Sequence, residues 1–181
     1  GADVECRDGR GRTAMHLAAV ASSADTIDVL GGRLVDCRDD DKRTPLHLAA
    51  LKGHDDCCEV LLDLEATVDV QDSRGLTPLH LATQEAHTRV LDALIERGAK
   101  VDSLDARGLS PFLIACATGN EDSVMTLIEG GARLDVVDHA GKTAMHYACA
   151  GGNADVVKLL HERGGNVEVT DSAQRTPLHY A

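Results

Sequence analysis

The most informative segment of the sequence is Asp72-Ser73-Arg74-Gly75-Leu76-Thr77-Pro78-Leu79-His80. Its second half is a helix start, because a threonine N-cap accepts a hydrogen bond from the first turn and proline suits the position after it. The histidine three residues after the cap stands where a capping box has Glu or Gln, so its ring can reach back to the cap. A glycine two residues before the cap marks a tight turn. We therefore expect a turn followed directly by a short helix.

This pattern recurs along the whole chain. A Thr/Ser–Pro/Ala–apolar–His/Leu tetrad occurs six times, at intervals of 31 residues and then four times 33, and an aspartate stands five residues before each cap. The caps are Thr13, Thr44, Thr77, Ser110, Thr143 and Thr176, and the aspartates are Asp8, Asp39, Asp72, Asp105, Asp138 and Asp171. After each complete tetrad a second apolar segment follows at helical spacing, as in residues 55–64 and 88–97. Such a period is typical of repeat proteins, whose units bury their cores against their neighbours.

The repeating unit resembles the ankyrin repeat in its tetrad, in the Asp-x-x-Gly-x-Thr turn (72–77) and in the Gly-Ala-x-Val tail (98–101). The resemblance covers essentially the whole chain. It implies an all-α fold, an ankyrin-repeat solenoid of stacked helix-turn-helix pairs with projecting β-hairpin loops. Residues 1–181 should form a single array with helix pairs at 13–43, 44–76, 77–109, 110–142 and 143–175 and partial units at 1–12 and 176–181. Because neither end carries a polar capping helix, we expect the chain to be part of a longer protein.

Two departures from the pattern carry expectations of their own. The first pair is two residues short, so either its second helix loses about half a turn or residues are absent from the sequence. In the fourth pair Leu113 replaces the histidine and Phe112 replaces Leu or Met. We expect that helix start to be held by apolar packing instead of a polar network.

Composition excludes several classes of protein. The formal net charge is −12, which argues against binding to nucleic acid or to anionic membranes, because both need basic residues to neutralise phosphate. No run of 18 apolar residues exists, so we expect no membrane insertion. The six cysteines include no Cys-x-x-Cys pair, which favours a reducing, intracellular and specifically cytoplasmic location.

The histidines and cysteines have structural explanations. Five of the nine histidines occupy the tetrad, one per unit, and equivalent residues of stacked helix pairs lie roughly 10 Å apart. That distance is too large for shared zinc coordination, so we expect caps and hydrogen bonds between loops. Cys57, Cys58, Cys116 and Cys149 fall at helix-packing positions and should behave as small apolar residues. With no nucleophile motif and no phosphate-binding glycine loop, the sequence predicts no catalytic residue, no metal, no cofactor and no enzyme activity.

Function follows from the resemblance, which implies a protein-protein interaction module or scaffold. The alternative is an accessory ankyrin region of a larger enzyme or membrane channel whose activity lies outside this chain. A longer parent sequence with kinase motifs or a membrane block would decide between the two.

The candidate binding site comes from the charge pattern of six hairpin loops, residues 7–12, 38–43, 71–76, 104–109, 137–142 and 170–175. Together these loops carry a net charge of +2, whereas the rest of the chain carries −14. Leu76 and Leu109 stand just before the cap, where the other loops have Arg or Lys. The predicted site is Arg43, Leu51, Arg74, Leu76, Arg107 and Leu109, which suits a protein or peptide with acidic and apolar residues. In the alternative interpretation, the two leucines pack on neighbouring hairpins.

Overall fold

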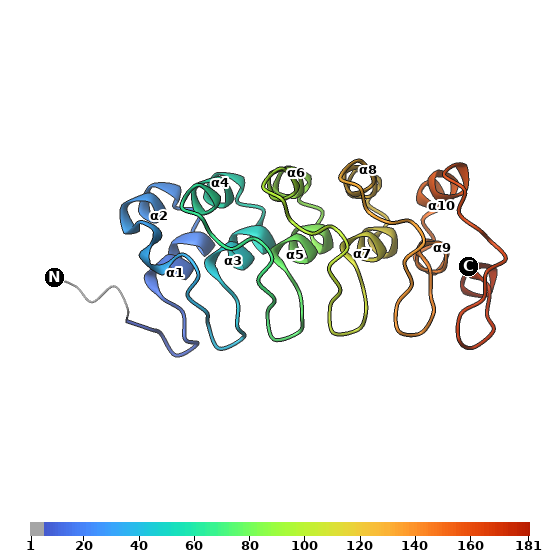
Figure 1. Ribbon diagram of the computed structural model, residues 1–181, viewed down its shortest axis with the longest axis horizontal. Helices are drawn as coiled ribbons and strands as arrows, with labels where there is room; N and C mark the ends of the chain where they lie inside the picture. Colours follow the sequence, from blue (N-terminus) through green and yellow to red (C-terminus); the bar gives the residue numbers. More distant parts are fainter. Residues whose placement is uncertain (1–5) are drawn as a thin grey trace. The chain divides into compact units, whose positions relative to one another are not determined.

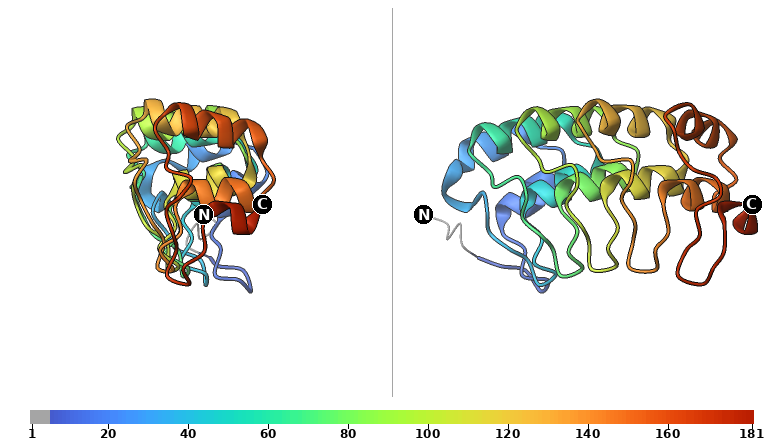
Figure 2. Two further views of the ribbon diagram at one scale, coloured as in Figure 1. Left: turned by 90° about the vertical axis from the view of Figure 1, so that its right-hand side faces the viewer. Right: turned by 45° about the vertical axis from the view of Figure 1, so that its right-hand side comes forward.

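The chain divides into two compact units, unit 1 (Gly1–Ala99) and unit 2 (Lys100–Ala181), and the computed structural model describes residues 6–181. Within each unit the helices stand in antiparallel pairs, and loops project from one side of the stack (Figures 1 and 2). Outside the helices these residues contain one isolated β-bridge, between Val137 and Thr143, and no β-strand. The expectation of an all-α fold of stacked helix pairs is confirmed.

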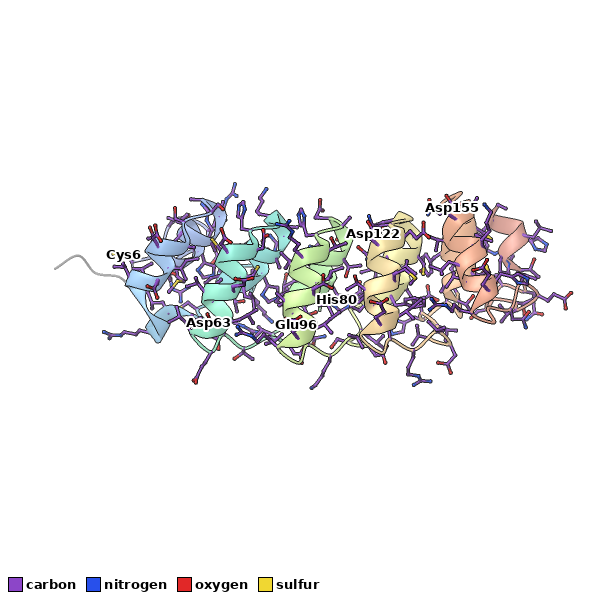
Figure 3. All side chains as sticks on the ribbon, turned by 90° about the horizontal axis from the view of Figure 1, so that it is seen from above. Cys6, Asp63, His80, Glu96, Asp122 and Asp155 are labelled. Atoms are coloured by element: carbon purple, nitrogen blue, oxygen red, sulfur yellow. The ribbon has the colours of Figure 1, made fainter. Side chains whose placement is uncertain are left out.

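Unit 1 contains three helix pairs and a short 3-10 helix, η1 (Gly32–Leu34). The pairs are α1 (Ala14–Val20) with α2 (Ala24–Leu30), α3 (Pro45–Lys52) with α4 (Asp55–Asp63), and α5 (Pro78–Gln84) with α6 (Thr88–Glu96). The inner layer is α1, α3 and α5, and the outer layer is α2, α4 and α6 (Figure 1). Seen from above, Asp63 and Glu96 lie on the outer helices, where Asp63 pairs with Arg97 at 2.6 Å (Figure 3).

Unit 2 contains two helix pairs and a terminal 3-10 helix. They are α7 (Pro111–Thr118) with α8 (Glu121–Glu129), α9 (Ala144–Ala150) with α10 (Ala154–Glu162), and η2 (Pro177–Tyr180). Inner helix α7 packs on α9, and α9 packs on η2, so the inner layer continues to the end of the chain.

The helix starts follow the sequence motif. Each inner helix begins one residue after its predicted cap, and the backbone N–H of Thr44 donates to Nδ1 of His47 at 3.1 Å. The other ring nitrogen, Nε2, then carries the proton and donates to the carbonyl oxygen of Leu76 at 3.1 Å. His16 and His146 make the same two contacts, with the carbonyls of Arg43 and Arg175 at 2.9 and 3.0 Å. Each of these histidines therefore joins a helix start to the next hairpin loop, as expected.

The apolar replacement in the fourth pair is also confirmed. The N–H of Leu113 donates to the cap hydroxyl of Ser110 at 3.3 Å, and the side chains of Phe112 and Leu113 are fully buried. A leucine side chain has no donor for the following loop, so apolar packing replaces the histidine contact.

The shortened first pair has the predicted consequence. Helix α2 has seven residues, whereas α4, α6, α8 and α10 each have nine. Two residues correspond to about half a turn of helix. The short helix η1 follows directly and leads the chain to the next hairpin loop.

The cysteines lie mostly where the register placed them. Cys57, Cys58 and Cys116 are fully buried, and burial raises the pKa of Cys116 to about 12. Cys149 is only partly buried. At the three buried positions the thiols act as small apolar residues in the seams between helices.

Candidate partner-binding site

Each hairpin loop is closed by its own aspartate. In residues 71–76, Oδ1 of Asp72 accepts hydrogen bonds from the N–H groups of Arg74 and Leu76 at 2.8 and 2.9 Å. The N–H of Asp72 in turn donates to the carbonyl of Leu76 at 2.9 Å. The same pattern recurs at Asp8, Asp39, Asp105, Asp138 and Asp171. These carboxylates shape the loops and leave the residue before each cap fixed at both its N–H and its carbonyl.

This closure corrects the prediction for two site residues. Leu76 and Leu109 are only 3% and 7% exposed, so they cannot be the surface anchors that the sequence predicted. The hydrogen bonds of Leu76 to Asp72 and His47 hold its backbone against the helix start, and its apolar side chain turns into the protein. The alternative, that the two leucines pack inside the protein, agrees with their burial.

The other four predicted residues remain accessible. Leu51 is half-buried on α3, and the side chains of Arg43, Arg74 and Arg107 are 22%, 57% and 71% exposed. Arg43, Leu51 and Arg74 belong to unit 1, whereas Arg107 belongs to unit 2 and donates to its own turn carboxylate, Asp105, at 3.1 Å. The long apolar stems of these arginines reach outward and keep the charged guanidinium groups at the surface.

A groove of about 550 Å³ lies beside Arg43 and Leu51 in unit 1. Val20, Leu48 and Leu51, from α1 and α3, supply its apolar part. Its charged lining residues are Arg10, Arg12, Asp39, Asp40, Asp41, Arg43 and Lys52. Among all the residues that line the groove, the sequence predicted only Arg43 and Leu51 as partner-binding.

The charges of the groove are not equally available. Arg12 donates to Asp8 at 2.8 Å, which holds the pKa of Asp8 at about 2, and the carboxylate of Asp39 is used inside its own loop. Arg10 and Lys52 have no ion-pair partner within residues 6–181. The groove therefore offers the positive charges of Arg10 and Lys52 beside an apolar surface, with the carboxylates of Asp40 and Asp41 exposed at one loop tip.

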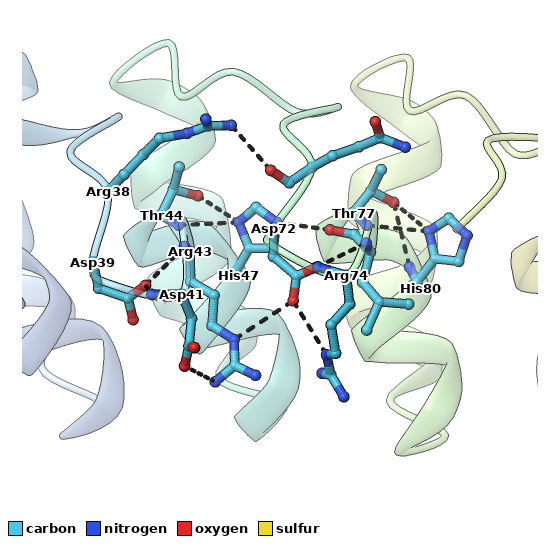
Figure 4. Close-up of polar contacts among 12 residues, drawn as sticks. Arg38, Asp39, Asp41, Arg43, Thr44, His47, Asp72, Arg74, Thr77 and His80 are labelled. Atoms are coloured by element: carbon cyan, nitrogen blue, oxygen red, sulfur yellow. Dashed lines mark hydrogen bonds and ion pairs between the residues drawn. The ribbon is translucent and has the colours of Figure 1, made fainter. Parts of the chain in front are cut away.

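A cluster of charged groups joins the second and third loops of unit 1 (Figure 4). The Nε atoms of Arg43 and Arg74 each lie 3.7 Å from Oδ2 of Asp72, whose side chain is completely buried. Nη1 of Arg43 lies 3.7 Å from Oδ2 of Asp41. Two guanidinium groups thus flank one buried carboxylate.

Unit 2 contains an aromatic and basic cluster that the sequence reasoning missed. The hydroxyls of Tyr147 and Tyr180 donate to the turn carboxylates Asp138 and Asp171 at 2.7 and 2.6 Å. Two cations lie over the Tyr180 ring: Lys142 Nζ is 4.6 Å from its centroid, and Cζ of the Arg175 guanidinium is 4.7 Å from it. These hydrogen bonds shift the pKa values of two groups. Burial and the hydrogen bond to Asp138 raise the pKa of the Tyr147 hydroxyl. The hydrogen bond from the Tyr180 hydroxyl lowers the pKa of the Asp171 carboxyl.

The signal for this cluster was present in the sequence. The position four residues after the cap is tyrosine only at 147 and 180 and is Leu or Ile in the other repeats. Tyrosine and arginine are the side chains most often found at the energetic centre of protein interfaces.

A second cavity lies in unit 2 and has a volume of about 350 Å³. Most of its lining is aliphatic, from Leu134, Val137, Met145, Leu160 and Val169, with Arg163 and Asn166 among its polar residues. Within residues 6–181 no group of three or more His, Cys, Asp or Glu side chains is placed to hold a metal ion. Over the same range no helix has both the length and the hydrophobicity to cross a bilayer.

Comparison with known proteins identifies the family. A family model described as "Ankyrin repeats (3 copies)" matches residues 1–72, 31–105, 65–138 and 112–181, so that the matches together span the chain. No curated protein matches the sequence. Ankyrin repeats are generally protein-interaction modules and are typically non-catalytic. Because this match agrees with the repeated motif and with the paired helices, the chain belongs to the ankyrin repeat family.

Proposed function

We propose that this chain binds a partner protein or peptide on the hairpin-loop and inner-helix face of unit 1, in the groove beside Arg43 and Leu51. The observation that carries the proposal is the groove itself, where apolar residues adjoin the cations Arg10 and Lys52. Its volume of about 550 Å³ falls in the range of about 300–1,000 Å³ that binding pockets occupy. The setting we propose is a reducing, intracellular compartment, as the cysteine usage favours.

The rigidity of the loops supports a binding role. Backbone hydrogen bonds join neighbouring loops, from Asp40 N–H to the Arg10 carbonyl at 3.1 Å and from Ser73 N–H to the Asp41 carbonyl at 2.8 Å. The Arg38 guanidinium adds a bond of 3.0 Å to the Gln71 carbonyl. A surface held in this way loses little conformational entropy when a partner binds, which favours affinity.

The lining indicates the chemistry of the partner. Apolar side chains of a partner can pack against Val20, Leu48 and Leu51, and its carboxylates can form ion pairs with Arg10 and Lys52. A segment that carries both apolar and acidic residues therefore fits best. Its acidic residues also complement the net positive charge of the hairpin loops.

Selection from a random peptide library displayed on phage, against the full chain, tests the proposal. We expect the selected peptides to combine acidic and apolar residues and, in NMR titrations, to shift signals of α1, α3 and their loops. Replacing Lys52 by Glu, or Leu51 by Asp, should weaken binding at least tenfold. Val29→Asp, on the exposed surface of α2, is the matched control and should leave binding unchanged. Failure to select any peptide, or signal changes confined to the outer helices, would reject the proposal.

A further inference from the structure

We infer that the apolar cavity of unit 2 binds an aliphatic monocarboxylate, with the hydrocarbon chain inside the cavity and the carboxylate at Arg163 and Asn166. The cavity is lined by α9, by the end of α10 and by the segments that follow α8 and α10 (Figure 1). All of its lining residues belong to unit 2, so it shares none with the groove of the proposed function.

The cavity combines buried and exposed apolar side chains. Met145 and Leu160, from α9 and α10, are buried, whereas Leu134 and Val137 are 37% and 49% exposed. Exposed apolar side chains gathered at a hollow are typical of a binding site. The volume of about 350 Å³ lies at the lower end of the range of about 300–1,000 Å³ for ligand pockets, so a small ligand fits.

A glycine keeps one wall of the cavity open. At the position of Gly165, three other helix pairs have a buried alanine, namely Ala66, Ala99 and Ala132. A Cβ atom on Gly165 would lie 3.0 Å from Cε of Met145 and 2.7 Å from the carbonyl oxygen of Leu160, and both residues line the cavity. The fifth pair therefore lacks a methyl group at a point where the other pairs are filled.

The backbone N–H of Asn166 is suited to a carboxylate. At the same place in two other repeats, the N–H groups of Thr67 and Arg133 donate to the carboxylates of Asp36 and Asp102, both at 3.0 Å. The N–H of Asn166 makes no hydrogen bond within residues 6–181. The repeat itself thus shows which group this N–H binds.

The aspartate equivalent to Asp36 and Asp102 has another partner in this repeat. Both carboxylate oxygens of Asp135 accept from the guanidinium of Arg133 at 3.1 Å. The second charged residue in the lining, Arg163, donates only to the sulfur of Met125 at 3.7 Å, and thioethers are weak acceptors. Its guanidinium is therefore available for a charge-assisted hydrogen bond to a ligand.

The placement of the polar groups determines the class of ligand. Most of the lining is aliphatic and offers no partner to a peptide group, so a chain with one polar end fits better than a peptide. Because Arg133 neutralises Asp135, Arg163 leaves the lining with a charge of +1. One carboxylate balances that charge, whereas a phosphate brings roughly two negative charges.

Isothermal titration calorimetry of the full chain with butanoate, hexanoate and octanoate tests the inference. Each CH₂ group that enters the cavity should raise affinity about fourfold, so hexanoate should bind about 16-fold more tightly than butanoate. Octan-1-ol has the chain of octanoate without its charge and should bind at least tenfold more weakly. No binding, an affinity independent of chain length, or equal affinity for the alcohol would overturn the inference.

Two further measurements separate this site from other sources of binding. In methyl NMR spectra, octanoate should shift the signals of Val137 and Met145 and leave that of Leu48, in the groove of unit 1, unchanged. Signal changes in unit 1 alone would place the binding elsewhere. N-acetyl-leucine represents the carboxyl terminus of a protein partner, and tighter binding of this compound than of hexanoate would overturn the assignment to an aliphatic carboxylate.

Substitutions test the two ends of the site. Arg163→Gln should lower affinity for octanoate at least fivefold and leave affinity for octan-1-ol unchanged. Lys158→Gln is the matched control, because it removes the same charge from α10 at a residue that does not line the cavity. An equal loss in Lys158→Gln would contradict the site.

Gly165→Ala restores the alanine of the other repeats and should weaken binding of both octanoate and octan-1-ol, because it narrows the apolar part of the cavity. Unchanged affinity for both compounds in a folded Gly165→Ala chain would contradict the role of this wall. Because Arg163 is exposed, its replacement keeps the test valid even if Gly165→Ala fails to fold.

Discussion

Replacing Leu76 by alanine tests how the hairpin loops are built. Leu76 is 3% exposed, so truncation removes about three buried carbon atoms, which cost about 2.4 kcal/mol at roughly 0.8 kcal/mol each. The cavity left behind adds to this, since buried Leu→Ala changes typically cost about 2–5 kcal/mol. We expect a loss of about 3 kcal/mol in the free energy of unfolding. For a chain of this size, that corresponds to a decrease in melting temperature of roughly 6–12 °C.

Urea and thermal unfolding, followed by far-ultraviolet circular dichroism, measure this effect. The matched control is Leu178→Ala, because Leu178 is 80% exposed and its truncation should change stability by less than about 0.5 kcal/mol. A melting temperature that moves by less than about 1 °C in Leu76→Ala would refute the reasoning. Combined with weaker peptide binding, that result would restore Leu76 as an exposed anchor.

Three further predictions address ionisable groups. Burial lowers the pKa of His47 from its ordinary 6.5 to about 4, so the His47 side chain binds a proton more tightly in the unfolded chain than in the folded one. The free energy of unfolding should therefore fall by up to about 3 kcal/mol as the pH drops from 6.5 to 4. Urea unfolding of His47→Leu should lack that part of the pH dependence. Tyr180→Phe removes the hydroxyl that donates to Asp171 and should raise the pKa of Asp171 towards its ordinary value in a carbon-13 NMR titration; an unchanged titration would show that the bond is absent in solution. With a chromogenic disulfide reagent, the exposed thiol of Cys6 should react within the mixing time, whereas buried Cys116, with a pKa near 12, should react only as the chain unfolds; equal rates would contradict the packing of α7.

Local motifs made the helix starts predictable. Cap, proline and histidine act within four residues, so the beginning of each inner helix could be placed from the sequence. The missing half turn of α2 could be placed as well, because the register of the neighbouring motifs fixes where residues are lost.

The exposure of the loop residues could not be predicted in the same way. The burial of Leu76 depends on loop closure by Asp72 and on the ring of His47, which is 29 residues away in sequence. The contact between Arg43 and Asp72 likewise joins two separate loops. The residue before each cap is leucine in two loops and Arg or Lys in the other four. This variation was a usable signal that the position is at least half-buried, because side chains with apolar stems and polar ends are typical of such sites.

The leucine at position 113 has a consequence for cooperativity. In a repeat protein, the coupling between neighbouring repeats is a sum of interface energies, and a hydrogen bond contributes about 1 kcal/mol to such a sum. Because Leu113 cannot donate to the loop at 137–142, the contact between α7 and that loop lacks this hydrogen bond and depends on the burial of Phe112 and Leu113 instead. The cooperativity of the fourth repeat therefore depends on apolar burial and not on a hydrogen bond of about 1 kcal/mol.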